Sequence, residues 1–281
     1  MSFRLDRLAT LYLASPVRRL ASSGPFIPIL MYHSITDDDE SGVHAYYRTN
    51  TSPSVFRQHM QGLQDLGYST ISLADAVAAL RNRASANKHA VVTFDDGYAD
   101  FYREAFPALS RLGFTATVFL PTSYIGTTPL QFKRKDCLTW SEVQELRRHG
   151  ISFGSHTVTH PQLSTLDDAA VKSEIVNSKQ RIEDNLGEPV DSFAYPFAFP
   201  EENSSFVQML RDVLVESGYQ QGVSTRIGTA RQGEDRYFLR RLPMNSLDDV
   251  SLFEAKLLGG YDWLHGVQYA SKLVKRALHP N

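Results

Sequence analysis

The chain has 281 residues, of which 42% are hydrophobic, and a chain of this size and composition can bury a large core in one barrel-sized domain. Its 29 Lys and Arg against 31 Asp and Glu leave a net charge of -2, which provides no broad positive field for nucleic acid. A single cysteine, Cys137, excludes an intrachain disulfide and a cysteine-cluster zinc site, so a metal would need His and carboxylate ligands.

The first 25 residues combine arginines with a short apolar segment that polar residues and a proline interrupt. A membrane span needs about 20 apolar residues, and the segment is also a poor match to a signal peptide. We therefore expect a cytoplasmic protein in which residues 1–25 form an arm, helical in part, that packs on the domain. An amphipathic helix lying on a membrane surface is the alternative, with its polar side formed by Arg4, Arg7, Arg18 and Arg19.

From residue 26 onward, short apolar runs alternate with longer segments of helical period, which is typical of parallel βα units. Seven such runs indicate an α/β barrel. The predicted strands cover residues 27–32, 90–94, 115–120, 151–154, 192–195, 220–223 and 237–239. The predicted helices cover residues 54–66, 73–81, 102–112, 141–149, 167–186 and 204–216, followed by one or two helices over 253–277.

Glycines follow several of the predicted helices, where a C-terminal cap is expected. No repeat, low-complexity tract or long linker divides the rest of the chain. We therefore predict a single barrel domain over residues 26–281 that ends in a helical tail. The capping glycines are Gly67, Gly113, Gly150, Gly187 and Gly218.

The most informative stretch is Thr93-Phe-Asp-Asp-Gly97, where an apolar strand ends in the adjacent carboxylates Asp95 and Asp96. Two like charges at a strand end are costly unless a cation lies beside them, and a metal ion is one solution. A turn with an Asp helix cap is the alternative interpretation.

A second apolar strand runs into His156 and His160. In a helical turn, a spacing of four places both imidazoles on one face, close enough to bind one ion. Taken alone, such a pair also fits two solvated or core histidines. However, both stretches follow predicted parallel strands, at the end where barrel enzymes assemble their sites. Two His and one Asp would leave coordination positions open for water and substrate, as a catalytic metal requires.

Together, Thr93-Phe-Asp-Asp-Gly97 and His156-Thr-Val-Thr-His160 resemble the first two motifs of the polysaccharide deacetylases, the NodB-like carbohydrate esterases. The similarity extends over most of the chain and includes the Met-Tyr-His motif that ends at His33. The resemblance implies a distorted (β/α)7 barrel and a divalent metal, zinc first, with cobalt or nickel as substitutes. It also implies hydrolysis of acetamide groups on hexosamines such as N-acetylglucosamine.

By this resemblance Asp95 is the general base, and Asp96, His156 and His160 are the metal ligands. Metal binding lowers the pKa of water, so Asp95 would take up a proton as the water attacks the acetyl carbonyl. A backbone N–H near Tyr195 would be a further donor to the oxyanion.

The sequence departs from the family pattern in two places. Ala194 stands where the third motif usually has an arginine, and Arg241 would take over the task of keeping Asp95 ionised. A structural salt bridge at the barrel rim is the alternative role for Arg241. The usual Leu-x-His motif of the general acid is not visible, and His33 is the candidate for that role, with packing or hydrogen bonding to a loop as its alternative.

Aromatic residues near the motifs can form a stacking floor for a sugar, because sugar rings present apolar C–H faces to flat π surfaces. The candidates are Tyr98, Trp140, Tyr195 and Phe197, and for Trp140 core or rim packing is the competing interpretation.

We therefore expect an amidohydrolase of the polysaccharide deacetylase type that acts on a poly- or oligosaccharide or a lipid-linked glycan. A cytoplasmic location favours a biosynthetic precursor, as in exopolysaccharide biosynthesis. Hydrolysis of cyclic amides such as ureides on the same fold is one alternative, and a non-catalytic glycan-binding protein with a degenerate site is another. Carbohydrate is the expected partner, and the oligomeric state is not predicted.

Overall fold

Seven parallel strands close into a barrel in the computed structural model, which describes residues 4–20, 24–82 and 88–278. The strand order is β2-β14-β12-β11-β10-β7-β6, and β6 pairs back with β2 to complete the barrel. The barrel strands are β2 (Ile29–Tyr32), β6 (His89–Phe94), β7 (Thr117–Leu120), β10 (Ser152–Ser155), β11 (Ser192–Ala194), β12 (Gln221–Ile227) and β14 (Leu239–Pro243). The predicted (β/α)7 barrel is confirmed.

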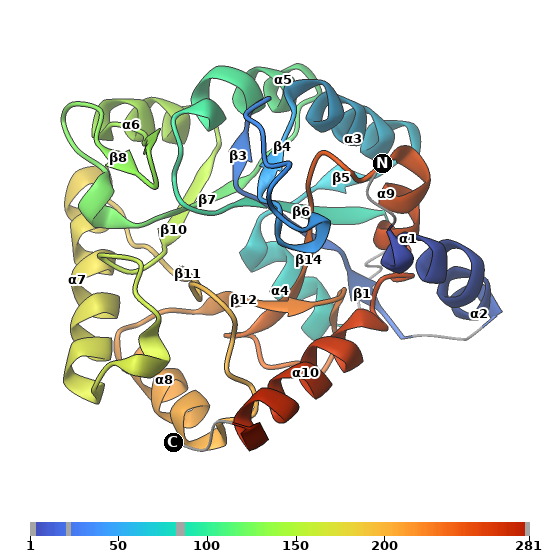
Figure 1. The fold of residues 1–281 in the computed structure, drawn as a ribbon. Coiled ribbons are helices and arrows are strands. Elements are labelled where there is room, and N and C mark those ends of the chain that lie inside the picture. Colours follow the sequence, from blue (N-terminus) through green and yellow to red (C-terminus); the bar gives the residue numbers. More distant parts are fainter. Residues whose placement is uncertain (1–3, 21–23, 83–87, 279–281) are drawn as a thin grey trace.

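Helices surround these strands as a ring (Figure 1). Several begin at a side-chain cap, such as Ser72 at the start of α4 and the capping box of Thr139 and Glu142 at the start of α6. The helices are α3 (Pro53–Asp65), α4 (Leu73–Arg81), α5 (Phe106–Arg111), α6 (Trp140–Arg148), α7 (Asp168–Leu186), α8 (Ser204–Glu216), α9 (Val250–Leu257) and α10 (Leu264–Leu278).

Successive residues of each barrel strand face opposite sides, and this alternation divides the core in two. On β6, Val92 and Phe94 pack between the strands and the outer helices, whereas Val91 packs inside the barrel. The interior cluster also contains four residues of α4, which closes one end of the barrel: Leu73, Ala76, Val77 and Leu80. The predicted site residues follow the strands and belong to the other end of the barrel.

The described part of the N-terminal arm is helical and lies beside α9, outside the ring of helices (Figure 1). Arg4 pairs with the buried Asp248 at 3.0 Å and Arg7 with Asp249 at 2.6 Å, so these two arginines bind the domain. The arm consists of α1 (Leu5–Ala9), a π-helical turn η1 (Thr10–Ala14) and α2 (Ser15–Leu20). The boundary at residue 25 stays a prediction.

None of the described helices combines the length and the apolar composition that a membrane crossing needs. The tail contains two helices, α9 and α10, separated by a turn at Gly259 and Gly260. The predicted strand at 237–239 starts two residues later and continues to Pro243.

Short paired segments that the sequence did not predict cover the barrel ends. One is an antiparallel hairpin between β7 and α6, and another is a parallel pair in the loop that follows β2. These segments are β1 (Phe26–Ile27) with β13 (Ala230–Arg231), β3 (Ser34–Ile35) with β4 (Asn50–Thr51), β5 (Ser69–Thr70) on β6, and β8 (Gln131–Phe132) with β9 (Lys135–Asp136).

Candidate metal centre

The end of β6 positions the two adjacent carboxylates. Asp95 and Asp96 are both 2% exposed, and the chain turns sharply after them because Asp96 and Gly97 have φ angles of 69° and 60°. A Cβ atom at Gly97 would meet the Leu120 side chain at 3.0 Å, so both the space and the backbone conformation favour glycine there. The turn therefore holds two buried carboxylates at the mouth of the barrel.

The histidine stretch after β10 is a loop, so the expected helical turn is wrong. Thr157 and His160 have φ angles of 70° and 57°, and this backbone brings the His156 and His160 rings to a centroid distance of 4.7 Å. Glu174 of α7 holds the loop by accepting hydrogen bonds from two of its backbone N–H groups, both at 2.8 Å. The sequence spacing therefore identified the two histidines that lie together, although a loop and not a helical turn brings their rings together.

Asp96, His156 and His160 form a buried group whose candidate ligand atoms lie within 4.8 Å of one another. His160 Nε2 lies 3.2 Å and His156 Nε2 lies 3.7 Å from Asp96 Oδ1. Within the described ranges, this is the only such group of three or more His, Cys, Asp or Glu residues. The three predicted ligands are thus together in space.

The chemistry of this group fits a divalent cation. Asp96 Oδ1 and His160 Nδ1 are buried, and neither has a hydrogen-bond partner among the described residues. His156 Nδ1 lies 2.8 Å from the Ala194 carbonyl oxygen and must donate to it, which leaves the Nε2 lone pair directed at the group. Burial lowers the pKa of His156 to about 4, so the ring is neutral, as a metal ligand must be.

Both carboxylates are ionised despite their burial. Burial alone would raise the pKa of Asp96, but the contact with His160 and the charges of His33 and Lys133 hold this pKa well below its ordinary value. For Asp95, burial also acts to raise the pKa, and the Arg241 guanidinium outweighs it, so the pKa of Asp95 is lowered. The centre therefore offers negative charge to a cation.

Arg241 forms a bidentate ion pair with Asp95 inside the barrel. Its Nη1 and Nη2 atoms donate to the two Asp95 carboxylate oxygens, each at 2.7 Å, and both side chains are buried. Arg241 Nε also donates to the Ser224 carbonyl oxygen at 3.1 Å, and Nη1 donates to Thr93 Oγ1 at 3.2 Å. The guanidinium is fixed by partners on β6 and β12, and it therefore fixes the Asp95 carboxylate.

His33 follows β2 and lies close enough to the two carboxylates to feel their charge. Burial lowers the pKa of His33, while Asp95 and Asp96 act in the opposite direction. The structure thus brings the predicted acid candidate to the same end of the barrel as the base candidate.

Three of the four predicted sugar-stacking aromatics are buried. Tyr195 is fully buried on the outer face of its strand with Phe193, and its N–H already donates to the Val223 carbonyl oxygen at 3.0 Å. Trp140 also belongs to this core. Tyr98 is buried and donates its hydroxyl to Asp96 Oδ2 at 3.0 Å. These three rings are covered, so an exposed stacking floor cannot include them.

Phe197 is the aromatic that remains at the site. Its ring is 46% exposed and lies 4.8 Å from the His160 ring. The Phe197 N–H has no hydrogen-bond partner within the described ranges. This unpartnered N–H lies two residues beyond Tyr195, near which the third motif is expected to supply a backbone donor.

Sequence reasoning missed the β8–β9 hairpin, which carries Lys133 to the centre. Lys133 Nζ lies 3.3 Å from Asp96 Oδ2 and 4.5 Å from the centroid of the Phe132 ring. Lys135 anchors the hairpin by donating to Ser34 Oγ at 2.6 Å and Asn50 Oδ1 at 2.8 Å. The turn residues, Lys133 and Arg134, lack the Asn-Gly signature that marks such hairpins, so this hairpin could not be predicted from its turn.

Unfavourable backbone conformations concentrate at this centre. Seven described residues other than glycine have positive φ, and six of them lie in the segments just described. Such conformations cost about 1–3 kcal/mol each and persist only where the surroundings enforce them, which is typical of functional sites. The six are Asp96, Lys133, Arg134, Thr157, His160 and Phe197.

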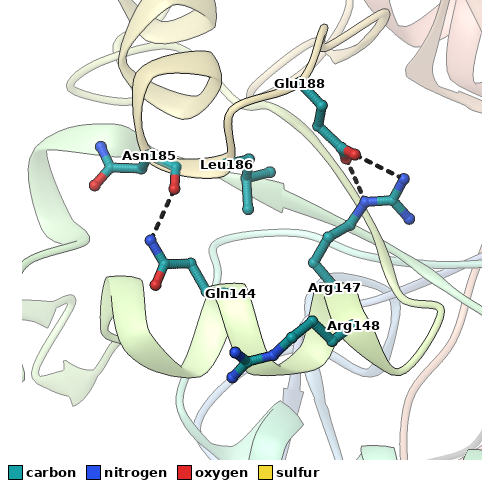
Figure 2. Close-up of a pocket in the computed structure, with 6 residues that line it drawn as sticks. All are labelled: Gln144, Arg147, Arg148, Asn185, Leu186 and Glu188. Carbon is teal, nitrogen blue, oxygen red and sulfur yellow. Dashed lines mark hydrogen bonds and ion pairs between the residues drawn. The ribbon is translucent and has the colours of Figure 1, made fainter.

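A cavity of about 540 Å³ lies away from this centre, between the C-terminal ends of α6 and α7. Figure 2 shows the residues that line it. Here Arg147 pairs with Glu188, and Gln144 donates to the Asn185 carbonyl oxygen at 2.8 Å. None of the six residues lining this cavity has a buried side-chain atom without a partner. Since these helix ends precede strands, the cavity lies at the opposite end of the barrel from the carboxylates.

Comparisons with known proteins agree with this geometry. Residues 82–220 match the family model described as polysaccharide deacetylase. YxkH of Bacillus subtilis (strain 168), a protein named for the polysaccharide deacetylases, is 32% identical over 231 residues, which are 82% of this chain and 75% of YxkH.

Two further proteins extend the comparison. The Escherichia coli (strain K12) poly-β-1,6-N-acetyl-D-glucosamine N-deacetylase is 31% identical over 139 residues, which are 46% of this chain and 20% of that longer protein. The solved structure of the Streptococcus pyogenes deacetylase PplD in complex with acetate superposes with a TM-score of 0.72 at 26% identity, over 84% of this chain and 99% of PplD. The likeness to YxkH over most of both chains, together with the barrel, places this protein in the polysaccharide deacetylase family.

Proposed function

We propose that this protein hydrolyses the acetamide group of an N-acetylated hexosamine in a poly- or oligosaccharide or a lipid-linked glycan, and releases acetate. The observation that carries the proposal is the buried, unpaired Asp96 Oδ1 beside two histidine nitrogens and an ionised Asp95. The names of two relatives, one an N-acetyl-D-glucosamine polymer deacetylase and one a deacetylase that binds acetate, support this substrate class.

In this proposal, Asp96, His156 and His160 hold a divalent metal, zinc first, with cobalt or nickel as substitutes. Such an ion supplies a Lewis acid for the acetyl carbonyl and lowers the pKa of water. Asp96 contributes an anionic oxygen. His156 contributes Nε2, because its Nδ1 donates to the Ala194 carbonyl oxygen and this hydrogen bond fixes the tautomer of the ring. Asp96 Oδ2 faces Tyr98 and Lys133, which leaves Oδ1 for the cation.

Asp95 takes up the proton of the attacking water. Its Oδ2 lies 3.9 Å from His156 Nε2, so the carboxylate adjoins the ligand group without belonging to it. Arg241 is a positioning residue that keeps this carboxylate ionised and oriented through two hydrogen bonds. His33 is the candidate that passes this proton on from Asp95 to the leaving amine.

Phe197 completes the arrangement. Its N–H, which has no partner among the described residues, is the proposed donor to the carbonyl oxygen as negative charge develops there. Its exposed ring, which lies against His160, offers the flat apolar face on which a sugar can stack. The same residue thus contacts both the acetyl group and the sugar.

The test combines elemental analysis for bound metal with an assay of acetate release from N-acetylglucosamine oligomers. Asp95→Asn is compared with Asp212→Asn, an exposed carboxylate on α8 that lies outside the site. We expect near-stoichiometric metal in all three proteins and acetate release in the unmodified protein and in Asp212→Asn alone.

Other outcomes separate the alternatives. Metal without acetate release would leave the centre intact and redirect the search to other amides, including cyclic ones. If no divalent metal were retained or could be added back, the ligand assignment would fail, and a glycan-binding role would replace the enzymatic one.

A further inference from the structure

A groove of about 450 Å³ lies between the N-terminal arm, the loop after β3 and helix α10. Its volume falls within the roughly 300–1,000 Å³ typical of pockets that bind small molecules. The arm contributes Leu5, the loop contributes residues 44–47, and α10 contributes Leu264 and Val267. The groove therefore exists only because the arm and the tail pack at the edge of the barrel.

The groove reaches the segment that carries Phe197. Ala198 lines it and directly follows Phe197, whose ring lies against His160. The loop residues 44–47 belong to the connection that starts at His33 after β2. Both walls of the groove are thus continuous with segments that carry site residues.

The charged side chains in the groove are already paired. Arg4 binds Asp248 and Asp6, and Asp6 also accepts a hydrogen bond from Tyr261 at 2.7 Å. Lys272 pairs with Glu201 at 3.0 Å. No unpaired cation or carboxylate among the lining residues is left for an ionic ligand, so a neutral ligand fits the groove.

Aromatic and apolar surface remains for that ligand. Tyr47 is 67% exposed, and its ring packs edge-on against Tyr46 at a centroid distance of 5.0 Å. Leu5 and Val267 are also exposed. Phenol rings offer a flat face and a hydroxyl on one side chain, and this combination suits neutral sugars, which present apolar C–H faces and hydroxyl groups together.

We propose that this groove is a glycan subsite, in which sugar residues linked to the N-acetylated residue at the metal centre stack on Tyr47. The inference rests on the proposed function and deepens it, because a subsite outside the barrel implies a neutral oligomer or polymer as the substrate and not a free monosaccharide. The arm, which lies outside the barrel, then takes part in substrate binding.

The experiment measures kcat/KM for acetate release from N-acetylglucosamine oligomers of one to six residues. Tyr47→Ala and Val267→Asp alter the groove, and Tyr12→Ala, at a 70% exposed tyrosine of the arm that does not line the groove, is the control. We expect kcat/KM of the unmodified protein to rise about tenfold or more from monomer to tetramer, a gain of about 1.4 kcal/mol. Both groove variants should lose most of this gain through KM, while Tyr12→Ala keeps it.

A kcat/KM that does not change with oligomer length would overturn the subsite and leave the proposed deacetylation standing. If no oligomer releases acetate, the proposed function fails, and the subsite is judged by calorimetric titration with the tetramer. Binding that Tyr47→Ala weakens would support it, and absence of binding would overturn it. If Tyr47→Ala and Val267→Asp changed binding to phosphatidylcholine vesicles but not binding to the oligomers, the groove would be a lipid site. That outcome would also overturn the proposal.

Discussion

The cavity between α6 and α7 and the candidate metal centre differ in how their polar groups are paired. At the cavity between α6 and α7, Arg147 and Glu188 pair with each other, although this cavity is roomy at about 540 Å³ (Figure 2). At the candidate metal centre, Asp96 Oδ1 is buried without a hydrogen-bond partner among the described residues. A buried acceptor without a partner is costly, and a bound cation removes that cost. An unpaired buried carboxylate oxygen, and not volume, therefore distinguishes the candidate metal centre from this cavity.

The largest expected effect is on stability, and it appears when breaking the buried ion pair of Arg241 is compared with breaking the half-exposed ion pair of Arg147. Arg241→Met leaves the buried Asp95 without its cation, and loss of one partner from a buried pair costs about 3–5 kcal/mol. Arg147→Met breaks the half-exposed pair with Glu188 and should cost less than about 1 kcal/mol. Urea unfolding of both variants measures the difference. Equal losses would contradict the contrast between the centre and the cavity.

Metal addition gives the next effect. A divalent ion at 100 times its dissociation constant should stabilise the unmodified protein by about 2.7 kcal/mol, because it binds the folded state alone. Asp96→Asn should lose most of this stabilisation, whereas Glu188→Gln at the opposite end should keep it. Thermal unfolding with and without zinc reads out both variants. A metal-dependent Tm shift that survives in Asp96→Asn would remove Asp96 from the ligand set.

Lys133 allows a finer test of the charge balance at the centre. Its ammonium lies 3.3 Å from Asp96 Oδ2 and competes electrostatically with a metal cation. Because Lys133 is half-exposed, removing it by Lys133→Met should tighten metal binding by about 1 kcal/mol, roughly fivefold. Arg134→Met, the neighbouring exposed cation on the same turn, should leave metal affinity unchanged. Chelator competition measures this, and weaker binding in Lys133→Met would show that Lys133 supports Asp96 instead.

The smallest effect is expected at the arm. Burial acts to raise the pKa of Asp6, but hydrogen bonds from Arg4 and Tyr261 outweigh it and bring the pKa to about 2. A lowered carboxylate pKa contributes stability that is complete above the ordinary value of 3.8 and is lost as pH falls toward 2. After solvent screening, about 1 kcal/mol is at stake. The difference in unfolding free energy between the unmodified protein and Asp6→Asn should shrink from pH 5 to pH 2, and a constant difference would contradict this.

Sequence patterns predicted the barrel well because buried parallel strands are continuous apolar runs. The same pattern located the site motifs, since Asp95 and His156 follow such runs directly and Asp96 and His160 come shortly after them. The strand that carries Arg241 was placed two residues early, because two arginines interrupt its apolar character.

The surroundings of the centre were harder to predict. Tyr195 was expected to face the site, but strand alternation, which is visible in the sequence, places it on the opposite face from Ala194. Lys133 arrives on a hairpin of two-residue strands, which are too short to give a periodic signal. The loop of His156 and His160 depends on left-handed backbone and on Glu174, which is distant in sequence, and neither leaves a local pattern.

The left-handed conformations at Asp96, Thr157, His160 and Phe197 also have a consequence for how the sequence would evolve. Glycine would occupy each of these backbones at lower free energy, so mutational drift under selection for stability alone would replace the residues. In a lineage that had lost the activity, substitutions to glycine at these four positions should be among the earliest changes in the sequence. Where these four residues are retained instead of glycine, selection for catalysis has outweighed selection for a more stable backbone.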